Sequence, residues 1–181
     1  MIKRRKHCYL IISIVLLVLV IVVFFTHFND TKEIDFNDNL YHEEICTYIE
    51  DNVFIQWSAA NRLDIYKPFC DYYFLGADNK YIYIYAAGKD YCYENNNLSG
   101  GGECYSFVRI KYKINQGVID FLGADVPPEG TKFAEVIKQL FPDYTRDRHK
   151  DMILSDGKTD DIMKGTLRRA CNYYQVENMS D

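Results

Sequence analysis

The sequence predicts an α+β protein in which an N-terminal transmembrane helix precedes a small antiparallel sheet of about four strands with helices packed on one face. Three observations lead to this prediction. A long apolar run stands near the N-terminus, alternating apolar and polar residues with turn signals occupy the middle of the chain, and apolar residues at helical spacing flank that region. Beyond the apolar run, the 181-residue chain has room for one ordinary domain.

The composition indicates a folded, acidic domain. Hydrophobic residues make up 48% of the chain and aromatic residues 15%, which is enough to build a core. After residue 28 the chain has 17 basic and 26 acidic residues, a balance of −9. A domain of this charge repels phosphate backbones, so we expect no nucleic-acid partner.

Residues 9–28 are predicted to form a membrane anchor. The 17 residues from Tyr9 to Phe25 contain nothing more polar than a serine and a tyrosine. At about 1.5 Å per residue they span a hydrocarbon core once the flanking side chains reach the interface. A cleaved signal peptide stays open as the alternative, although no small-residue cleavage pattern follows the run.

The residues before the anchor predict its orientation. Lysine and arginine are retained on the cytoplasmic side of a membrane. We therefore expect residues 1–8 to be a cytoplasmic tail, residues 29–39 a tether, and residues 40–181 an extracytoplasmic domain at the plasma (inner) membrane. The topology signal consists of four consecutive cations: Lys3, Arg4, Arg5 and Lys6.

Helices are predicted at both ends of the outer domain. Residues 40–60 have apolar side chains at helical spacing with acidic residues between them. Residues 133–140 place apolar side chains at i, i+3, i+4 and i+7, and Pro142 ends that element. A last helix is expected from about Asp160.

Four strands are predicted between these helices. Residues 69–75 and 81–85 are rich in aromatic and β-branched residues and are separated by a turn. Residues 108–114 alternate strictly, and Asn115-Gln116-Gly117 closes a tight hairpin into residues 118–122. The polar face of this hairpin should stay in water or meet a partner, and its candidate contact residues are Arg109, Lys111 and Lys113.

The stretch from Phe69 to Pro142 resembles a small extracytoplasmic domain of uncharacterised bacterial secreted and membrane-anchored proteins. The similar segments are residues 81–85, 98–101, 109–112, 127–130 and 137–142. The resemblance implies a role in the cell envelope, because such domains are sometimes found beside sensor-type metallopeptidase membrane proteins. It transfers no catalytic or binding residues.

Five cysteines lie in the outer domain, where an oxidising compartment favours pairing of an even subset. Cys92 and Cys104 flank the polar connection between two predicted strands and form the first expected disulfide. Cys46 and Cys171 lie on the apolar stripes of predicted helices and form the second. Cys70 is then the leftover thiol, and three interpretations stay open for it: a buried structural cysteine, an intermolecular disulfide giving a homodimer, or a nucleophile.

The sequence shows no catalytic constellation, and the expected protein is a non-enzymatic module that binds an envelope protein or wall component. The alternative is an envelope enzyme that uses an unpaired cysteine or carboxylates. Nucleophilic chemistry at Cys70 would require His42 or His149 nearby. We expect no metal and no cofactor, because neither C-x-x-C nor H-x-x-x-H spacing occurs.

Overall fold

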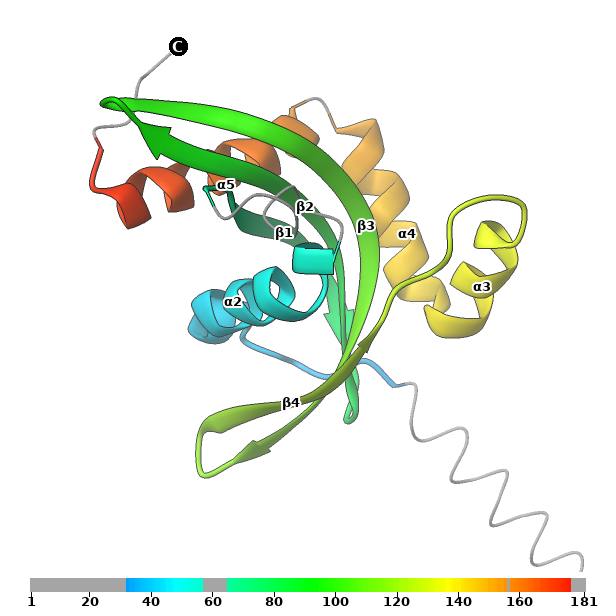
Figure 1. Ribbon diagram of the computed structural model, residues 1–181. Helices are drawn as coiled ribbons and strands as arrows, with labels where there is room; N and C mark the ends of the chain where they lie inside the picture. The colour runs from blue at the N-terminus through cyan, green and yellow to red at the C-terminus, as the bar shows by residue number, and fades with distance from the viewer. Residues whose placement is uncertain (1–31, 57–64, 156, 177–181) are drawn as a thin grey trace, which may run out of the picture.

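A computed structural model describes residues 32–56, 65–155 and 157–176 of the chain (Figure 1). It has an α+β fold with one four-stranded sheet, as predicted. The elements in chain order are η1 (Asp38–Tyr41), α2 (His42–Asn52), η2 (Phe54–Gln56), β1 (Lys67–Ala77), β2 (Tyr81–Glu94), β3 (Asn97–Asn115), β4 (Val118–Asp125), α3 (Phe133–Leu140), α4 (Asp143–Leu154) and α5 (Lys158–Tyr174).

The sheet is a meander of antiparallel hairpins in the order β1-β2-β3-β4. The predicted hairpin turn between β3 and β4 is confirmed, since Gln116 and Gly117 both have positive φ, 52° and 82°. Asn95 and Asn96, at 51° and 61°, make the corresponding turn between β2 and β3. These two strands are longer than predicted, because the polar and glycine-rich segment expected to be a loop is paired strand.

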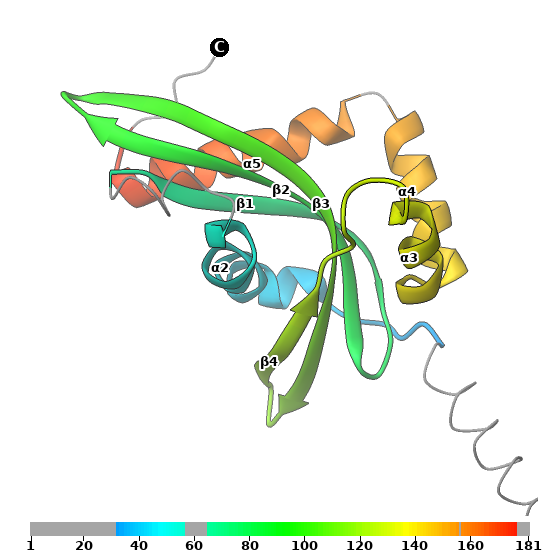
Figure 2. The ribbon, with the colours of Figure 1, turned by 45° about the vertical axis from the view of Figure 1, so that its right-hand side comes forward.

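Helices cover both faces of the sheet, so the prediction of helices on one face is wrong. Figure 2 shows α2 on one side of the sheet and α5 on the other. Ile82 and Ile84 of β2 share a core with α2, whereas Tyr83 between them packs against Phe141, the residue that follows α3. The cause lies mainly in Tyr83, whose ring is buried on the second face although its hydroxyl group makes the strand look half polar.

The helices differ from the prediction in two places. The first ends at Asn52, and η2 follows it to Gln56, while the last part of the predicted span, residues 57–60, lies outside the described residues. The helix α4 was not predicted, because it is mostly polar and buries only Thr145 and Met152. It packs beside the predicted α3 and α5 on the second face of the sheet.

The packed domain begins before residue 40. Ile34 donates its amide hydrogen to the carbonyl of Ala77 at 2.9 Å, and Phe36 is buried between the rings of Phe74 and Tyr112. The predicted tether is thus partly docked on the sheet. The predicted anchor and the cations before it lie outside the described residues, and no helix among the described ones is long and apolar enough to cross a membrane.

Candidate functional site

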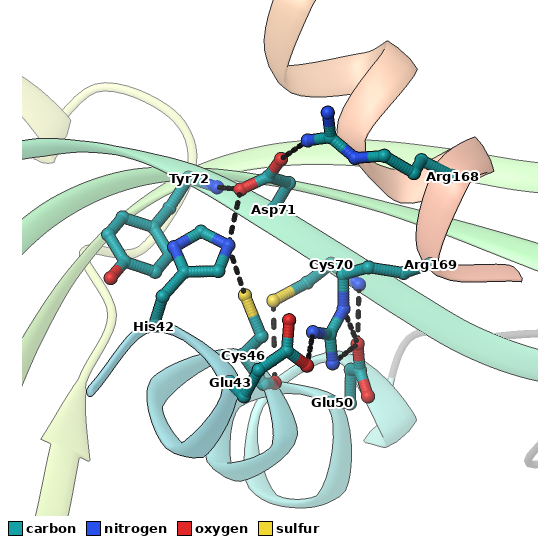
Figure 3. A network of polar contacts seen from close by, with 9 residues as sticks. All are labelled: His42, Glu43, Cys46, Glu50, Cys70, Asp71, Tyr72, Arg168 and Arg169. Carbon is teal, nitrogen blue, oxygen red and sulfur yellow. Dashed lines mark hydrogen bonds and ion pairs between the residues drawn. The ribbon is translucent and has the colours of Figure 1, made fainter. Parts of the chain in front are cut away.

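The helices α2 and α5 meet over the outer edge of β1, where their polar side chains form one network (Figure 3). Arg169 of α5 forms ion pairs with both Glu43 and Glu50 of α2, the latter at 3.0 Å. Glu50 is 4% exposed, and its Oε1 also accepts the backbone N–H of Cys70 at 2.9 Å. Burial raises the pKa of Glu50, while the Cys70 amide and Arg169 act in the opposite direction.

A second part of this network joins His42, Cys46 and Asp71. The Nε2 atom of His42 lies 3.2 Å from Oδ1 of Asp71 and 3.6 Å from Sγ of Cys46. One oxygen, one nitrogen and one sulfur from these three residues all lie within 4.8 Å of one another. The His42 ring also stacks on Tyr72, with ring centroids 4.8 Å apart.

Asp71 is held in place from several sides. Its Oδ1 accepts the backbone N–H of Tyr72 at 2.7 Å, and its Oδ2 lies 3.8 Å from the Arg168 guanidinium. Gly165 of α5 packs directly on this carboxylate, since a Cβ there would lie 1.5 Å from Oδ2. Gly165 therefore leaves room for Asp71 at a position where any side chain would displace it.

The network shifts the ionisation of its members. The hydrogen bond with Asp71, together with that to Cys46, raises the pKa of His42 to about 10. The hydrogen bond with the Cys70 thiol and the neighbouring His42 lower the pKa of Cys46. Burial, followed by the proximity of Cys46, raises the pKa of Cys70. Of the two neighbouring thiols, Cys46 is therefore the one that ionises more readily.

All five cysteines of the described residues are free thiols. Cys70 lies beside Cys46, and its Sγ donates to the Cys46 carbonyl at 3.4 Å. Both residues have 0% exposure. Cys171 lies on the last helix, α5, as predicted, but the expected bond to Cys46 is absent, since both residues are free thiols and the thiol beside Cys46 is that of Cys70.

The fold does not allow the predicted bond between Cys92 and Cys104. Cys104 lies opposite Gly88 in the sheet, whereas Cys92 lies opposite Ser99. Gly88 and Cys92 are four residues apart on one strand, or about 13 Å, which is far beyond the Cα separation that a disulfide spans. The prediction failed because the connection between the two cysteines is paired strand.

The opposite edge of the sheet is only partly covered. In the described residues β4 pairs with β3 from Arg109 to Asn115, so the half of β3 before Arg109 has a strand neighbour on one side only. Hydrogen-bond direction alternates along antiparallel strands. The backbone N–H groups of Cys70 and Tyr72 point outward from β1, away from β2. When the alternation is followed through the register of β1 with β2 and of β2 with β3, the backbone N–H groups of Glu103 and Tyr105 point outward from β3.

A pocket of about 690 Å³ lies beside this open half of β3. Its floor is aromatic: the rings of Tyr85 and Phe107 are 5.2 Å apart, and the His149 ring lies 4.2 Å from Phe107. Burial lowers the pKa of His149, which favours the neutral form of its ring. Phe133 of α3 and the loop from Val126 to Glu129 complete the wall.

The basic residues of the predicted contact face are only partly free. Arg109 lies over the ring of Tyr81 at 4.4 Å and forms an ion pair with Asp125 at 2.7 Å. Lys113 is paired with Asp120 at 3.5 Å, and Lys111 is exposed. These residues lie along the β4-covered half of β3 and are not in the pocket lining.

Two features of these sites were missed from the sequence. His42 and Cys46 are four residues apart on a predicted helix, a spacing that places two ligands on one face of that helix. Asp71 and the pocket depend on strand register and on α4, which local patterns do not specify. No known protein family, curated protein or solved structure matched the chain.

Proposed function

We propose that this chain is a single-pass membrane protein whose extracytoplasmic domain is a non-enzymatic module that binds an extended segment of another envelope protein. The apolar run at residues 9–28 and the cations before it support the anchor and its orientation. The observation that carries the binding function is the aromatic pocket beside the unpaired half of β3.

The proposed mode of binding is strand addition to β3. An extended peptide laid along this half of the strand would bond to the outward main-chain groups of Glu103 and Tyr105. Directly opposed residues of neighbouring strands point to the same face of a sheet. A peptide residue opposite Tyr105 would therefore direct its side chain onto the face where Tyr85 and Phe107 line the pocket.

The pocket indicates which side chain it accepts. Its lining is dominated by aromatic and proline residues, and the volume of about 690 Å³ suits one or two large apolar side chains. Tyr105 and Phe133 are 40% and 36% exposed, so apolar surface is available to a partner. We therefore assign an aromatic or branched aliphatic residue of the peptide to this position.

Charge favours a basic partner. Glu129 lines the pocket, and Glu103 lies on the open edge with Lys89 as its ion-pair partner at 3.3 Å. The outer part of the chain has a balance of −9. A segment with lysine or arginine beside its apolar anchor residue would associate faster and with better charge complementarity than an acidic one.

The enzyme alternative has less support from the geometry. Cys46 has both a histidine and a carboxylate in reach, but a nucleophile must contact its substrate, and this thiol is 0% exposed. Cys70 is equally buried, and its pKa is raised. Neither thiol is in a position to attack a substrate from solution.

Peptide selection tests the binding function. The purified full-length chain in detergent micelles is screened against a phage-displayed library of linear peptides, and selected peptides are measured by fluorescence anisotropy. We expect peptides with an aromatic or branched residue flanked by lysine or arginine. Phe133→Ala should weaken their binding by about tenfold, which corresponds to about 1.4 kcal/mol.

A matched pair of variants at Glu103 isolates the main-chain contribution. Both Glu103→Pro and Glu103→Thr remove the side-chain charge. Only the proline variant also removes the outward backbone N–H, which the threonine variant keeps. We expect binding to fall about 5- to 10-fold in the proline variant relative to the threonine variant, since one hydrogen bond is lost. Equal binding by the two variants, or a library that yields no peptide, would contradict strand addition.

A further inference from the structure

We propose that His42, Cys46 and Asp71 form a binding site for a zinc ion at the outer edge of β1. This site is at the opposite edge of the sheet from the pocket and does not depend on peptide binding. The three residues supply an imidazole nitrogen, a thiolate sulfur and a carboxylate oxygen, which is a donor set that suits Zn²⁺.

The distances between the donor atoms match a shared ion. Zinc bonds of about 2.0–2.3 Å at tetrahedral angles place neighbouring donor atoms about 3.3–3.8 Å apart. The observed separations are 3.2 Å between His42 and Asp71 and 3.6 Å between His42 and Cys46. The third pair, Cys46 and Asp71, lies within 4.8 Å, so two of the three separations already match and a side-chain adjustment of Cys46 or Asp71 of at most about 1 Å completes the site.

The use of a single imidazole nitrogen distinguishes a metal site from a nucleophilic triad. In a triad the histidine contacts the nucleophile through one ring nitrogen and the carboxylate through the other. Here Nε2 of His42 is the atom close to both Cys46 and Asp71. Figure 3 shows the Asp71 oxygen and the Cys46 sulfur both facing this nitrogen, and the three donor atoms lie within 4.8 Å of one another, a grouping that a cation can bridge.

The surroundings support the ligands. His42 and Cys46 are four residues apart on α2, so one turn of helix sets their separation. Asp71 is oriented by the Tyr72 amide, as outer partners orient metal-binding carboxylates, and Gly165 leaves space for it.

Charge and access are also compatible with zinc. One thiolate and one carboxylate neutralise a divalent cation, so the occupied site carries no net charge beside Arg168. The imidazole side chain of His42 is 30% exposed, which leaves a path for the ion from solvent.

Metal titration tests the proposal on the reduced full-length chain. We expect one equivalent of Zn²⁺ by elemental analysis, and with Co²⁺ as a probe a thiolate-to-cobalt charge-transfer band. Cys46→Ser should abolish that band. Asp71→Asn keeps the shape of the side chain but removes its charge, and it should weaken zinc binding by about 100-fold or more. Loss of a residue that only hydrogen-bonds to a metal ligand costs about 10- to 100-fold, so a larger loss indicates direct binding by Asp71.

Cys104→Ser and His149→Ala serve as controls, because these residues are of the same types and lie in the pocket at the other edge. Both should bind zinc as the unaltered chain does. Circular dichroism checks that each variant is folded, and zinc should raise the melting temperature of the unaltered chain by linkage but not that of Asp71→Asn.

Three results would overturn the proposal: no charge-transfer band from the reduced unaltered chain, equal zinc binding by Cys46→Ser and Cys104→Ser, or a disulfide between Cys46 and Cys70 in protein isolated from cells with its thiols alkylated beforehand. The last result would leave no thiolate for the metal.

Discussion

The two edges of the sheet differ in how their outward main-chain groups are covered. At β1 the outward amides of Cys70 and Tyr72 are bonded by carboxylates of Glu50 and Asp71, and helices close over them from both faces. At β3 the strand β4 covers only the half that begins at Arg109, and a pocket lies beside the rest. An exposed edge invites another strand, so a protein that closes one edge with buried charges and leaves the other open has room for a partner at the second.

The largest effect on stability is expected from a substitution that disrupts the closed edge at β1. Glu50→Ala would leave Arg169 and the Cys70 amide without their buried partner, and we expect a loss of about 3–5 kcal/mol in the free energy of unfolding. Glu103→Ala at the open edge removes an exposed partner of Lys89 and should cost less than about 1 kcal/mol. Urea denaturation of both variants measures the difference, and similar losses would show that the edges do not differ.

A smaller effect is expected from Gly165→Ala. The new methyl group would collide with the whole Asp71 side chain, with Cβ–Oδ2 and Cβ–Cβ separations of 1.5 and 2.8 Å. We expect destabilisation by about 1–3 kcal/mol from overpacking. The matched variant Gly102→Ala, whose new Cβ meets nothing closer than 3.8 Å, should change stability by less than about 0.5 kcal/mol. Thermal melts that order the two variants the other way would contradict the close packing of α5 on β1.

The smallest effect sharpens the description of the pocket. Burial lowers the pKa of His149 below its ordinary value of 6.5, so the unfolded chain takes up a proton at a higher pH than the folded one. Stability from this group is present above pH 6.5 and falls as the pH decreases below it. Between pH 7.5 and 5 the unfolding free energy of His149→Phe should decrease less steeply with falling pH than that of the unaltered chain. An unchanged slope would place this ring outside the core of the pocket.

Local patterns predicted much of the sheet and little of the sites. The turn at Gln116-Gly117 and the alternation before it belong to a few neighbouring residues, and both are confirmed. The coverage of both faces was missed because Tyr83 is amphipathic and was not recognised as core. The cluster of His42 and Asp71 arises from the packing of α2 on β1, which no local spacing encodes.

The cysteine prediction also failed because strand pairing is not visible in local sequence patterns. The expected bond between Cys92 and Cys104 followed from treating the glycine-rich segment between them as a loop. Glycines at 100–102 weaken a strand but do not prevent one when a long neighbour pairs with it, and here β2 does so. Register, which separates the two thiols, is set by the turn at Asn95 and Asn96.

Amide hydrogen exchange followed residue by residue is the most direct test of the difference between the edges. We expect slow exchange at the amides of Cys70 and Tyr72, although they lie on an edge strand, and fast exchange at those of Glu103 and Tyr105. A selected peptide should slow exchange at the latter two and leave the former unchanged. Equal protection of all four amides in the free protein would contradict the central claim that one edge is closed and the other open.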